Sequence, residues 1–584
     1  MRIVILPYLY NDRITSQRYI FFLFFGLLGL FLTGTVSAQT QDIVSPPPGT
    51  EAGQIEQYFE GGGVSAPTLQ IPDPVIDDDQ LMLPDNAEEL SLILTQVVVE
   101  GSTVYTKDEL SHLYMNRIGQ KIALAEVFKI SDEITVKYRN DGYILSRAIV
   151  PPQTIDDGTV RIVIVEGFIN EVLIEGEVPA QQSRLVAYSD KILNSRPLSN
   201  KDLERYLLLI RDLPGIKSEA TIRPAKDIPG ASDLVIHVEY KKMDGFVRLD
   251  NRGSEFNGPA RLWLGAGFNS LGDEFNQRVT LTFATAGEGM KELNYYDLGY
   301  EHHVGTEGKK LYFNLTSTGS QPGHTLSALN IDSKTQTFKL GFTNPLIRSR
   351  TKNLSLYADF VVRNSETKIF NDRLSKDKVR FVSLGALYDS TDRFGGINQL
   401  GLRLDQGMDI LNASKEGTTD VSRAKGQVDF TKLILTASRL QRINDSWSFF
   451  TSLKSQFTSS KLLASEEFGV GGERCVRAYD PSEVTGDRGT CLLLEMRYGQ
   501  NTVSNSVVGY QLFAYYDVGV VKRIEPGALG KTAKLASYGF GTRVNYRDWL
   551  SGSFEIAWPR TKEVDSRALD VKSSRLFLNL TARF

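Results

Sequence analysis

The sequence contains very few of the residues that build metal, redox and catalytic sites. Its 584 residues include two cysteines and five histidines. His302 and His303 are adjacent, so in a strand their side chains would point to opposite faces, which is poor geometry for one shared metal ion. The P-loop, zinc-protease, nucleophile-elbow and C-x-x-C patterns are all missing. The sequence therefore predicts no catalytic residue, no metal and no cofactor, and we expect a protein that is not an enzyme.

An excess of positive charge is also missing. The formal net charge is −4, so the sequence lacks the excess of Lys and Arg that is typical of nucleic-acid-binding proteins, and we expect no nucleic-acid partner. Residues 39–93 contain no Lys or Arg at all and are rich in Pro, Asp and Glu. A segment of this composition buries too little apolar surface to order itself, so we expect a linker.

One stretch of this linker, "GTEAGQIEQYFEGGG", has a different character. Thr50 is a suitable cap for a short helix near residues 50–60, and Ile55, Tyr58 and Phe59 would then share one face. A free helix this short is marginal in water, so it needs a surface on which to dock. A transient turn within the linker is the alternative.

Long apolar runs are missing after residue 38. Before that point, Arg13 and Arg18 precede the run "YIFFLFFGLLGLFL", and the small-residue pattern Val36-Ser37-Ala38 follows it. This order is typical of a secretory signal peptide, which we predict for residues 1–38, with an N-terminal membrane anchor as the alternative. No later run is long enough for a membrane-spanning helix, which needs about 20 apolar residues.

Two units of similar pattern follow the linker. In residues 94–167, the strand-like "TQVVVEG" precedes two segments with helical spacing and then two strands around a turn. Residues 168–241 repeat this order, beginning with "FINEVLIEG". The sequence therefore predicts two tandem β-α-α-β-β units, each with helices over a small mixed sheet.

From residue 244 onward the helical period disappears. Roughly 16 segments alternate apolar and polar residues between Gly, Asn and Asp, as in "RVTLTFATA" and "RLFLNLTARF". A sheet that faces lipid on one side and a wet lumen on the other produces this alternation, and it must close on itself. The predicted fold class is α+β domains followed by a transmembrane antiparallel β-barrel of about 16 strands at residues 244–584. A large soluble β-sandwich or propeller is the alternative.

The whole order of the chain resembles the two-partner secretion transporters, the haemolysin and filamentous-haemagglutinin exporters of the outer-membrane translocase superfamily. The two α+β units resemble POTRA domains (94–167, POTRA 1; 168–241, POTRA 2), and Phe584 resembles the terminal signal of bacterial outer-membrane barrels. The resemblance implies a place in the outer membrane of a Gram-negative bacterium, with the POTRA domains in the periplasm. The implied function is export of an unfolded haemolysin- or adhesin-like partner protein, without ATP.

The resemblance also implies the partners. They are the exported cargo, outer-membrane lipid and the barrel-assembly machinery that inserts the chain, which would work as a monomer. The helix near residues 50–60 would plug the pore at rest.

One alternative function is that of a barrel-assembly factor, although such relatives usually carry more POTRA domains. An exported β-rich enzyme, such as a polysaccharide hydrolase, is the other.

The most specific match is "GGERCVRAYDPSEVTGDRGTC", in a predicted lumen loop near residues 468–491. In this superfamily a long loop between two late strands folds back into the barrel and carries Val-Arg-Gly-Tyr/Phe at its tip. The corresponding residues here, with those that follow, are Val476, Arg477, Ala478, Tyr479, Gly486, Asp487 and Gly489. Ala478 replaces the glycine of the family motif, which indicates a tip without positive φ at that position.

The resemblance pairs the tip arginine with an aspartate on a neighbouring strand. In "YYDVG" the matching residues are Asp517 and Gly519, which implies an Arg477–Asp517 pair in a partly wet lumen, where the planar guanidinium suits a carboxylate. The two cysteines of an exported chain also permit one disulfide. Our hypothesis is that Cys475 and Cys491 close the base of a loop hairpin and keep the tip folded while cargo passes.

Overall fold

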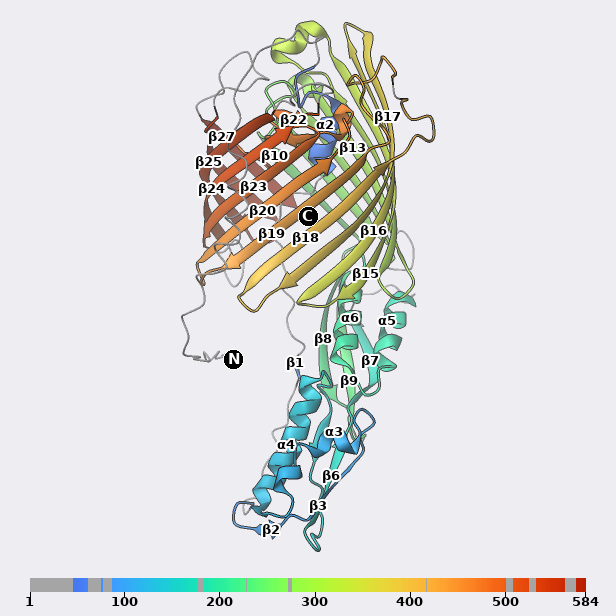
Figure 1. The fold of residues 1–584 in the computed structure, drawn as a ribbon, viewed down its shortest axis with the longest axis vertical. Helices are drawn as coiled ribbons and strands as arrows, with labels where there is room; N and C mark the ends of the chain where they lie inside the picture. The colour runs from blue at the N-terminus through green and yellow to red at the C-terminus, as the bar shows by residue number, and fades with distance from the viewer. Residues whose placement is uncertain are drawn as a thin grey trace. The chain divides into compact units, whose positions relative to one another are not determined.

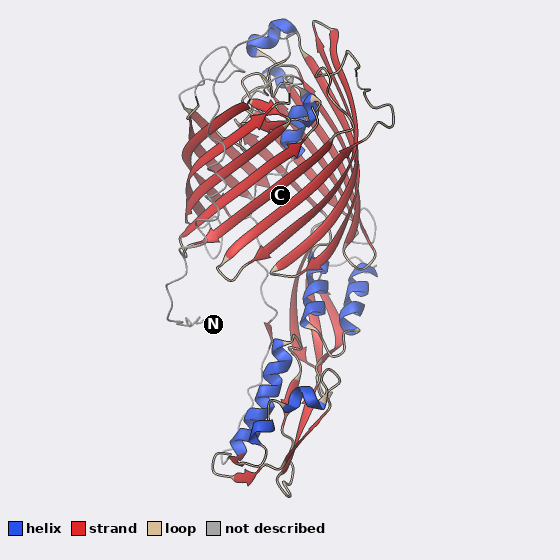
Figure 2. Cartoon of the chain, in the orientation of Figure 1, coloured by secondary structure: helices blue, strands red, loops and turns tan. Residues whose placement is uncertain are grey.

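Figures 1 and 2 show the fold of the protein in a computed structural model. The structure describes residues 46–60, 75–76, 87–176, 183–226, 228–270, 276–415, 417–499, 508–524, 532–561 and 574–584. The predicted signal peptide and most of the predicted linker lie outside these residues. In the described ranges, no helix has both the length and the hydropathy of a membrane span.

The first α+β unit is a small sheet covered by helices. Its elements are β2 (Ser91–Ile93), β3 (Gln96–Glu100), α3 (Lys107–Ser111), η1 (Met115–Arg117), β4 (Lys121–Ala123), α4 (Leu124–Asn140), β5 (Arg147–Ile149) and β6 (Thr159–Val165). β3 runs parallel to β6, and β5 runs antiparallel to it. α4 buries Val127, Ile130 and Ile134, one helical face, in the same core as Ile162 of β6.

The second α+β unit repeats this design. Its elements are β7 (Phe168–Gly176), α5 (Ser183–Leu193), α6 (Asn200–Arg211), β8 (Ile216–Pro224) and β9 (Ala231–Tyr240). A short strand from the preceding segment, β1 (Val75–Ile76), adds to the edge at β8, so the sheet order is β1-β8-β9-β7. Leu185 of α5 and Leu209 of α6 share the core with Leu234 of β9.

The rest of the chain closes into an antiparallel barrel. Its 16 strands, in order around the wall, are β10 (Met243–Asp250), β11 (Arg261–Asn269), β12 (Gln277–Ala286), β13 (Leu293–Val304), β14 (Lys309–Ser320), β15 (Asp332–Arg348), β16 (Lys352–Ile369), β17 (Asp372–Thr391), β18 (Gly396–Gly407), β19 (Thr431–Arg442), β20 (Trp447–Thr458), β23 (Arg488–Tyr498), β24 (Val508–Lys522), β25 (Thr532–Tyr546), β26 (Leu550–Pro559) and β27 (Arg575–Arg583). β27 pairs with β10 and closes the ring. The predicted fold class is therefore confirmed.

Side chains alternate across the barrel wall. On β27, Leu576, Leu578 and Leu580 are at least half exposed, whereas Phe577 between them is buried. On β13, Tyr296 is 54% exposed and Tyr295 is buried. The outer face is thus an apolar band, and polar side chains dominate the inner face, as in membrane barrels.

The two rims of the barrel differ. β9 of the second α+β unit leads through residues 241–242 into β10, so the rim at Met243 is the near rim and the opposite one is the far rim. β15, β16 and β17 are the longest strands, with 17, 18 and 20 residues. Figure 1 shows β16 and β17 extending past their neighbours at the far rim.

Two segments fill the lumen. One is the helix α2 (Ala52–Glu60), which contacts β14 and β15. The other is the inward loop, residues 459–487 between β20 and β23, with η4 (Ala464–Glu466), β21 (Phe468–Val470) and β22 (Val484–Gly486). The predicted loop end near residue 491 is wrong, because β23 already begins at Arg488 and places Gly489 and Cys491 in the barrel wall.

Candidate functional site

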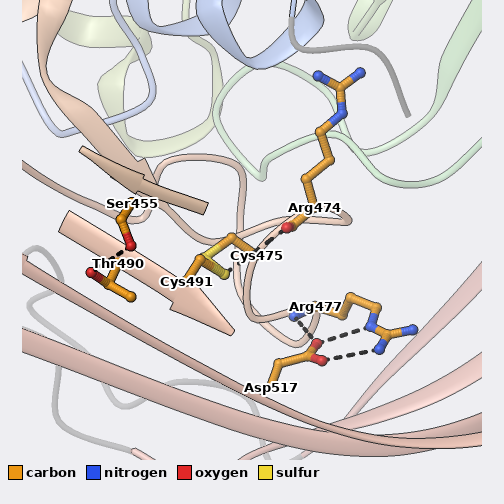
Figure 3. Close-up of a disulfide and its surroundings, with 7 residues drawn as sticks. All are labelled: Ser455, Arg474, Cys475, Arg477, Thr490, Cys491 and Asp517. Atoms are coloured by element: carbon orange, nitrogen blue, oxygen red, sulfur yellow. Dashed lines mark hydrogen bonds and ion pairs between the residues drawn. A yellow bond between two sulfur atoms is a disulfide. The ribbon is translucent and has the colours of Figure 1, made fainter. Parts of the chain in front are cut away.

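The tip of the inward loop is a compact structure rather than a loose connection. β21 and β22 pair as a short antiparallel hairpin. Phe468, Val476 and Tyr479 are buried in one core with wall residues that include Leu493 and Tyr515. The tip therefore lies against the inner faces of β23 and β24 (Figure 3).

Arg477 is the most highly coordinated side chain of this tip. Its Nε donates to Oδ2 of Asp517 at 2.9 Å, and its Nη2 donates to Oδ1 at 3.0 Å, which is the fork geometry of a bidentate pair. Its backbone N–H also donates to Oδ2 of Asp517, at 3.2 Å. Figure 3 shows Arg477 and Asp517 facing one another beside the disulfide.

Two further wall residues hold Arg477, and sequence reasoning missed both. Nη1 donates to Oε2 of Glu495 on β23 at 2.6 Å, and the guanidinium lies 3.4 Å from the ring centroid of Tyr515. Glu495 was detectable, because it follows Cys491 at even spacing on the same strand and so shares its lumen-facing side.

The surroundings of Arg477 are drier than we predicted. Arg477 is 5% exposed and Asp517 is fully buried, so the expectation of a partly wet pair is wrong. The cause is that the loop tip itself covers the pair. Burial lowers the pKa of the Arg477 guanidinium, but Asp517 and Glu495 outweigh burial and hold that pKa well above its ordinary value.

Cys475 and Cys491 are joined by a disulfide, with their Cα atoms 5.8 Å apart. Because Cys491 belongs to β23, the bond ties the loop tip to the barrel wall. Our hypothesis that it closes the base of a loop hairpin is therefore wrong in its geometry. The bond lies two residues from Arg477, so covalent and ionic contacts hold the same tip.

The remaining motif residues hold the rest of the loop. The hydroxyl of Tyr479 donates to the backbone oxygen of Thr561 at 2.6 Å and accepts the Thr561 N–H at 3.0 Å. Asp487 accepts Nη1 of Arg423 at 2.6 Å and the N–H groups of Leu462 and Ile524. Asp487 thus joins the loop end to the segment between β18 and β19.

The three glycines of the motifs mark close approaches. A Cβ on Gly489 would lie 2.2 Å from the Phe468 ring, and one on Gly519 would lie 2.4 Å from Val470 and 3.2 Å from Sγ of Cys475. A Cβ on Gly486 would meet the Lys522 backbone at 3.0 Å. Gly489 and Gly519 are wall positions where the loop occupies the space of a side chain, whereas Gly486 is a loop position that lies against the wall backbone.

Backbone strain in the tip falls on a different residue from the one that the motif indicates. Ala478 is not among the residues with positive φ. Val476 has a φ of +62°, which is rare for a β-branched residue. Such strain persists only where the surroundings fix the conformation, and here Val476 is fully buried beside the disulfide and Arg477.

α2 docks in the lumen through a buried polar cluster. Its Glu56 is fully buried and accepts hydrogen bonds from Thr337 and Thr318. Arg363 of β16 lies 3.4 Å from Oε1 of Glu56 and 3.1 Å from Oε1 of Glu60, and it also bonds Glu466 of η4 at 2.5 Å. One guanidinium therefore joins α2, the inward loop and the wall.

The apolar face of α2 makes a second contact. Ile55 lies in one core with Ala286 and Leu293, and Phe59 packs edge-on against Trp263 and Tyr295. The predicted cap is wrong, because the Thr50 hydroxyl donates to the Pro47 oxygen instead of accepting from the first helical turn.

Arg474 connects the loop tip directly to α2. Its Nη1 donates to the backbone oxygen of Tyr58, in the last turn of α2, where a cation is favoured by the helix dipole. The Tyr58 hydroxyl in turn accepts the N–H of Glu473 at 3.1 Å. In Figure 3 the Arg474 side chain points away from the disulfide, on the side opposite Arg477.

Phe584 lies at the seam where the barrel closes. Its N–H donates to the Gly245 oxygen at 3.0 Å, and its oxygen accepts the Gly245 N–H at 2.9 Å. Its ring covers Gly245, where a Cβ would lie 2.6 Å from it. The last residue therefore adds one more pair to the junction of β10 and β27.

These contacts hold two separate segments inside the lumen. Among the described residues, no group of three His, Cys, Asp or Glu side chains could hold a metal ion. Buried ion pairs at Arg477 and Arg363 set the positions of the inward loop and α2. An extended polypeptide needs that lumen space, so both segments are candidates for movement.

Comparison with known proteins agrees with this architecture. The profile of the family "Haemolysin secretion/activation protein ShlB/FhaC/HecB" matches residues 230–544, and that of the POTRA domain, ShlB-type, matches residues 92–167. The heme/hemopexin transporter protein HuxB of Haemophilus influenzae is 25% identical over 85% of this chain and 88% of its own. The outer membrane transporter CdiB of Dickeya dadantii is 25% identical over 76% and 78%.

Solved structures show the same fold. CdiB from Escherichia coli superposes with a TM-score of 0.72 at 19% identity and covers 93% of this chain and all of that one. CdiB from Acinetobacter baumannii superposes with a TM-score of 0.61 over 91% of this chain.

Proposed function

This chain belongs to the haemolysin secretion/activation family and is an outer-membrane transporter of two-partner secretion, and we propose that it moves an unfolded partner protein through a lumen closed at rest by α2 and the inward loop. Its POTRA domains lie in the periplasm. The near rim of the barrel is thus periplasmic, and the far rim is extracellular. Export needs no ATP, since folding of the cargo outside the cell can make forward movement effectively irreversible.

The periplasmic units are suited to receive an extended chain. Among the described residues, β3 is an edge strand of the sheet in the first unit, and β7 is an edge strand in the second. An extended segment can add to such an edge through main-chain hydrogen bonds, which give affinity with little demand on sequence. This mode of recognition suits an unfolded exported protein.

The observation that carries the proposal is the way α2 is held. Its apolar contact centres on Ile55 and Phe59, and its polar attachment is a buried cluster of Glu56 and Glu60 around Arg363. Desolvation offsets much of the Coulomb energy of buried ion pairs, so such contacts fix position more than they add stability. A polypeptide that enters the lumen can therefore displace α2 without unfolding the wall.

The inward loop differs from α2 in having a covalent attachment. The disulfide joins its tip to β23, and the bidentate Arg477–Asp517 pair then fixes its position against β24. We therefore assign α2 as the part that leaves the pore and the loop tip as the fixed part that lines the conduit.

Three smaller proposals complete this function. The chain acts as a monomer, which is supported by closure of the barrel within one chain. The barrel-assembly machinery inserts it, which is supported by the outward-facing alternation of β27 up to Phe584. It catalyses no reaction, which is supported by the transporter relatives that it matches.

Deletion in the native host tests the proposal. The culture supernatant and the outer-membrane proteome are compared by mass spectrometry, with the wild-type gene restored as control. Loss of one or a few large exported proteins, with other barrels unchanged, is the expected result. A joint loss of many outer-membrane barrels would instead identify an assembly factor.

A further inference from the structure

The outer wall of the barrel carries an apolar groove. It has a volume of about 720 Å³ and crosses the wall from β10 to β16. Most of its lining faces lipid: Leu281, Tyr296 and Leu315 are each about half exposed, whereas the adjacent Tyr295 packs on α2 in the lumen. Its volume lies within the roughly 300–1,000 Å³ of typical ligand pockets.

The strand register shows where this groove ends. One row of paired, outward-facing residues runs through Ala266, Leu281, Leu298, Leu315, Phe338 and Val362. The next residue of this row, opposite Val362 on β17, is Arg380. In the neighbouring row the lining ends at Asn364, and the residue opposite it is Lys378. In both rows the groove lining ends on β16, and the next residue, on β17, is a cation: Arg380 in one row and Lys378 in the other.

These cations lack acidic partners. Glu366, the nearest outward acid by register, already bonds Lys376 at 3.2 Å and lies 3.6 Å from Lys368. Within the part of the chain that the structure describes, Lys378, Arg380 and the neighbouring Lys334 form no ion pair with a carboxylate. The outer face of β15–β17 thus presents positive charge that an anion can neutralise.

Arg380 is 5% exposed and is fixed by the wall and by the segment that follows β18. Its Nη1 donates to the backbone oxygens of Arg363 and Val379, its Nη2 donates to Oδ1 of Asn364 at 2.9 Å, and its Nε donates to the Leu411 oxygen at 3.4 Å. None of these acceptors carries a charge. A buried guanidinium with only neutral acceptors gains strongly from a nearby anion.

The height of these cations places them at the outer surface of the membrane. Arg380 is 11 residues from Thr391, the periplasmic end of β17. At about 3.4 Å per residue and a tilt of about 40°, this length rises about 29 Å, slightly more than the roughly 25 Å apolar band of such barrels. Val382 and Leu384 face lipid below it.

We propose that this groove and the cations at its end bind an anionic glycolipid of the outer leaflet, of the phosphorylated lipid A class. One acyl chain lies on the row from Leu281 to Val362, and a phosphate lies on Lys378 and Lys334, next to the buried charge of Arg380. A phosphate supplies several acceptor oxygens for guanidinium and ammonium donors. The amides of Gln336 and Asn364, between groove and cations, suit the sugar hydroxyls.

Binding is measured on the purified full-length protein in detergent by native mass spectrometry. The probes are lipopolysaccharide, the same lipopolysaccharide after enzymatic dephosphorylation, phosphatidylglycerol and inorganic phosphate. The expected result is saturable binding of the phosphorylated glycolipid alone. Equal binding of phosphatidylglycerol, equal binding of the dephosphorylated lipid, or competition by inorganic phosphate alone would each overturn the assignment.

Two variants locate the phosphate site. Lys378→Glu and Lys334→Glu should each weaken binding of the phosphorylated glycolipid by about fivefold or more, since a basic residue near anionic lipid contributes about 1 kcal/mol. Lys352→Glu is the matched control, because Lys352 is an exposed cation at the periplasmic end of β16. Equal losses in all three variants would overturn the site.

A third variant tests the groove itself. Ala266→Phe adds a ring to the groove floor and should weaken binding, whereas Ala386→Phe adds the same ring to the outer wall of β17, outside the lining. Heat-modifiable migration on gels confirms that each barrel is folded before binding is measured. Unchanged binding in folded Ala266→Phe would exclude the acyl-chain position.

Discussion

Arg477 shows how one residue can fix the position of a long loop. Its guanidinium bonds Asp517 on one strand and Glu495 on the next, over the Tyr515 ring. All of these groups are removed from water, so their mutual attraction is largely offset by the loss of hydration. The arrangement therefore contributes specificity of position, and its failure leaves uncompensated carboxylates inside the barrel.

We predict that Arg477→Ala impairs export while the barrel still reaches the outer membrane. Removing one partner of a buried ion pair costs about 3–5 kcal/mol, which is enough to displace the part of the loop tip that the disulfide does not hold. Cargo in the supernatant, normalised to barrel in the membrane, should fall at least about tenfold. Arg477→Lys keeps the charge but loses the fork, so it should export an intermediate amount.

The matched control is Arg442→Ala. Arg442 bonds Asp445 in a turn at the periplasmic rim, and its side chain is 63% exposed. An exposed pair of this kind contributes about 0–1 kcal/mol, so export should be unchanged. Wild-type export by Arg477→Ala would refute the role of the tip.

The disulfide between Cys475 and Cys491 should stabilise the folded loop. Replacing both Cys475 and Cys491 by serine should lower the free energy of unfolding of the loop region by about 3 kcal/mol, because the bond closes a loop of about 15 residues. The measurement is the temperature at which the barrel loses its folded migration on gels. A wild-type transition, or two free thiols in the native protein by mass mapping, would contradict it.

Among the elements, α2 depends most on its surroundings. It has nine residues, too few for a stable free helix. The wall supplies Ser333 to its first N–H, and the inward loop supplies Arg474 to the carbonyls of Tyr58 and Phe59. We therefore expect α2 to become helical as it docks in the lumen.

That docking should weaken as pH rises. Burial raises the pKa of Glu56 from 4.5 to about 7, with Arg363 opposing. Below about pH 4.5 the Glu56 carboxyl is protonated whether α2 is docked or undocked. Between about pH 4.5 and 7 it keeps its proton only in docked α2. The free energy that favours docking therefore falls by up to about 3 kcal/mol as the pH rises through this window. Channel openings in planar bilayers should become more frequent from pH 5 to pH 7.5.

Variants separate this effect from a general pH response. Burial also raises the pKa of Glu51, just before α2, to about 8, which acts in the same direction. The double variant Glu51→Gln, Glu56→Gln should therefore open with little dependence on pH between 5 and 7.5. A double variant that keeps the wild-type profile would show that other groups control the helix.

Most of the barrel strands, and the helix α2, could be predicted from the sequence. The period of two along each strand gave the barrel and its approximate strand count, because lipid and lumen impose that period locally. The helical stretch at α2 was visible because Ile55, Tyr58 and Phe59 recur at helical spacing. The start of β23 was misplaced, since "RGTC" opens a wall strand with residues typical of a loop.

Contacts between distant segments were less predictable. Arg363 is one of 66 Lys and Arg residues, and nothing near it in the sequence indicates that Glu56, Glu60 and Glu466 surround it. Arg477 and Asp517 were found only because a family motif names them. The dryness of their site arises from the folded loop, which no local pattern reveals.

In the whole molecule, fixed and movable parts are separate. The barrel closes through Phe584 and β10, and the disulfide and Arg477 attach the inward loop to its wall. α2 is joined to that wall by ion pairs around Arg363 and by a few rings. Such a division lets the pore open while the membrane-spanning wall stays closed.

The most direct test is to lock α2 in the lumen. The Ala52 N–H donates to Oγ of Ser333 at 3.0 Å, so Ala52→Cys with Ser333→Cys should form a cross-link between α2 and β15 in the oxidising periplasm. We predict that export stops in the cross-linked protein and resumes on mild reduction, while either single variant and the wild type export throughout. Undiminished export by a fully cross-linked population would contradict the account.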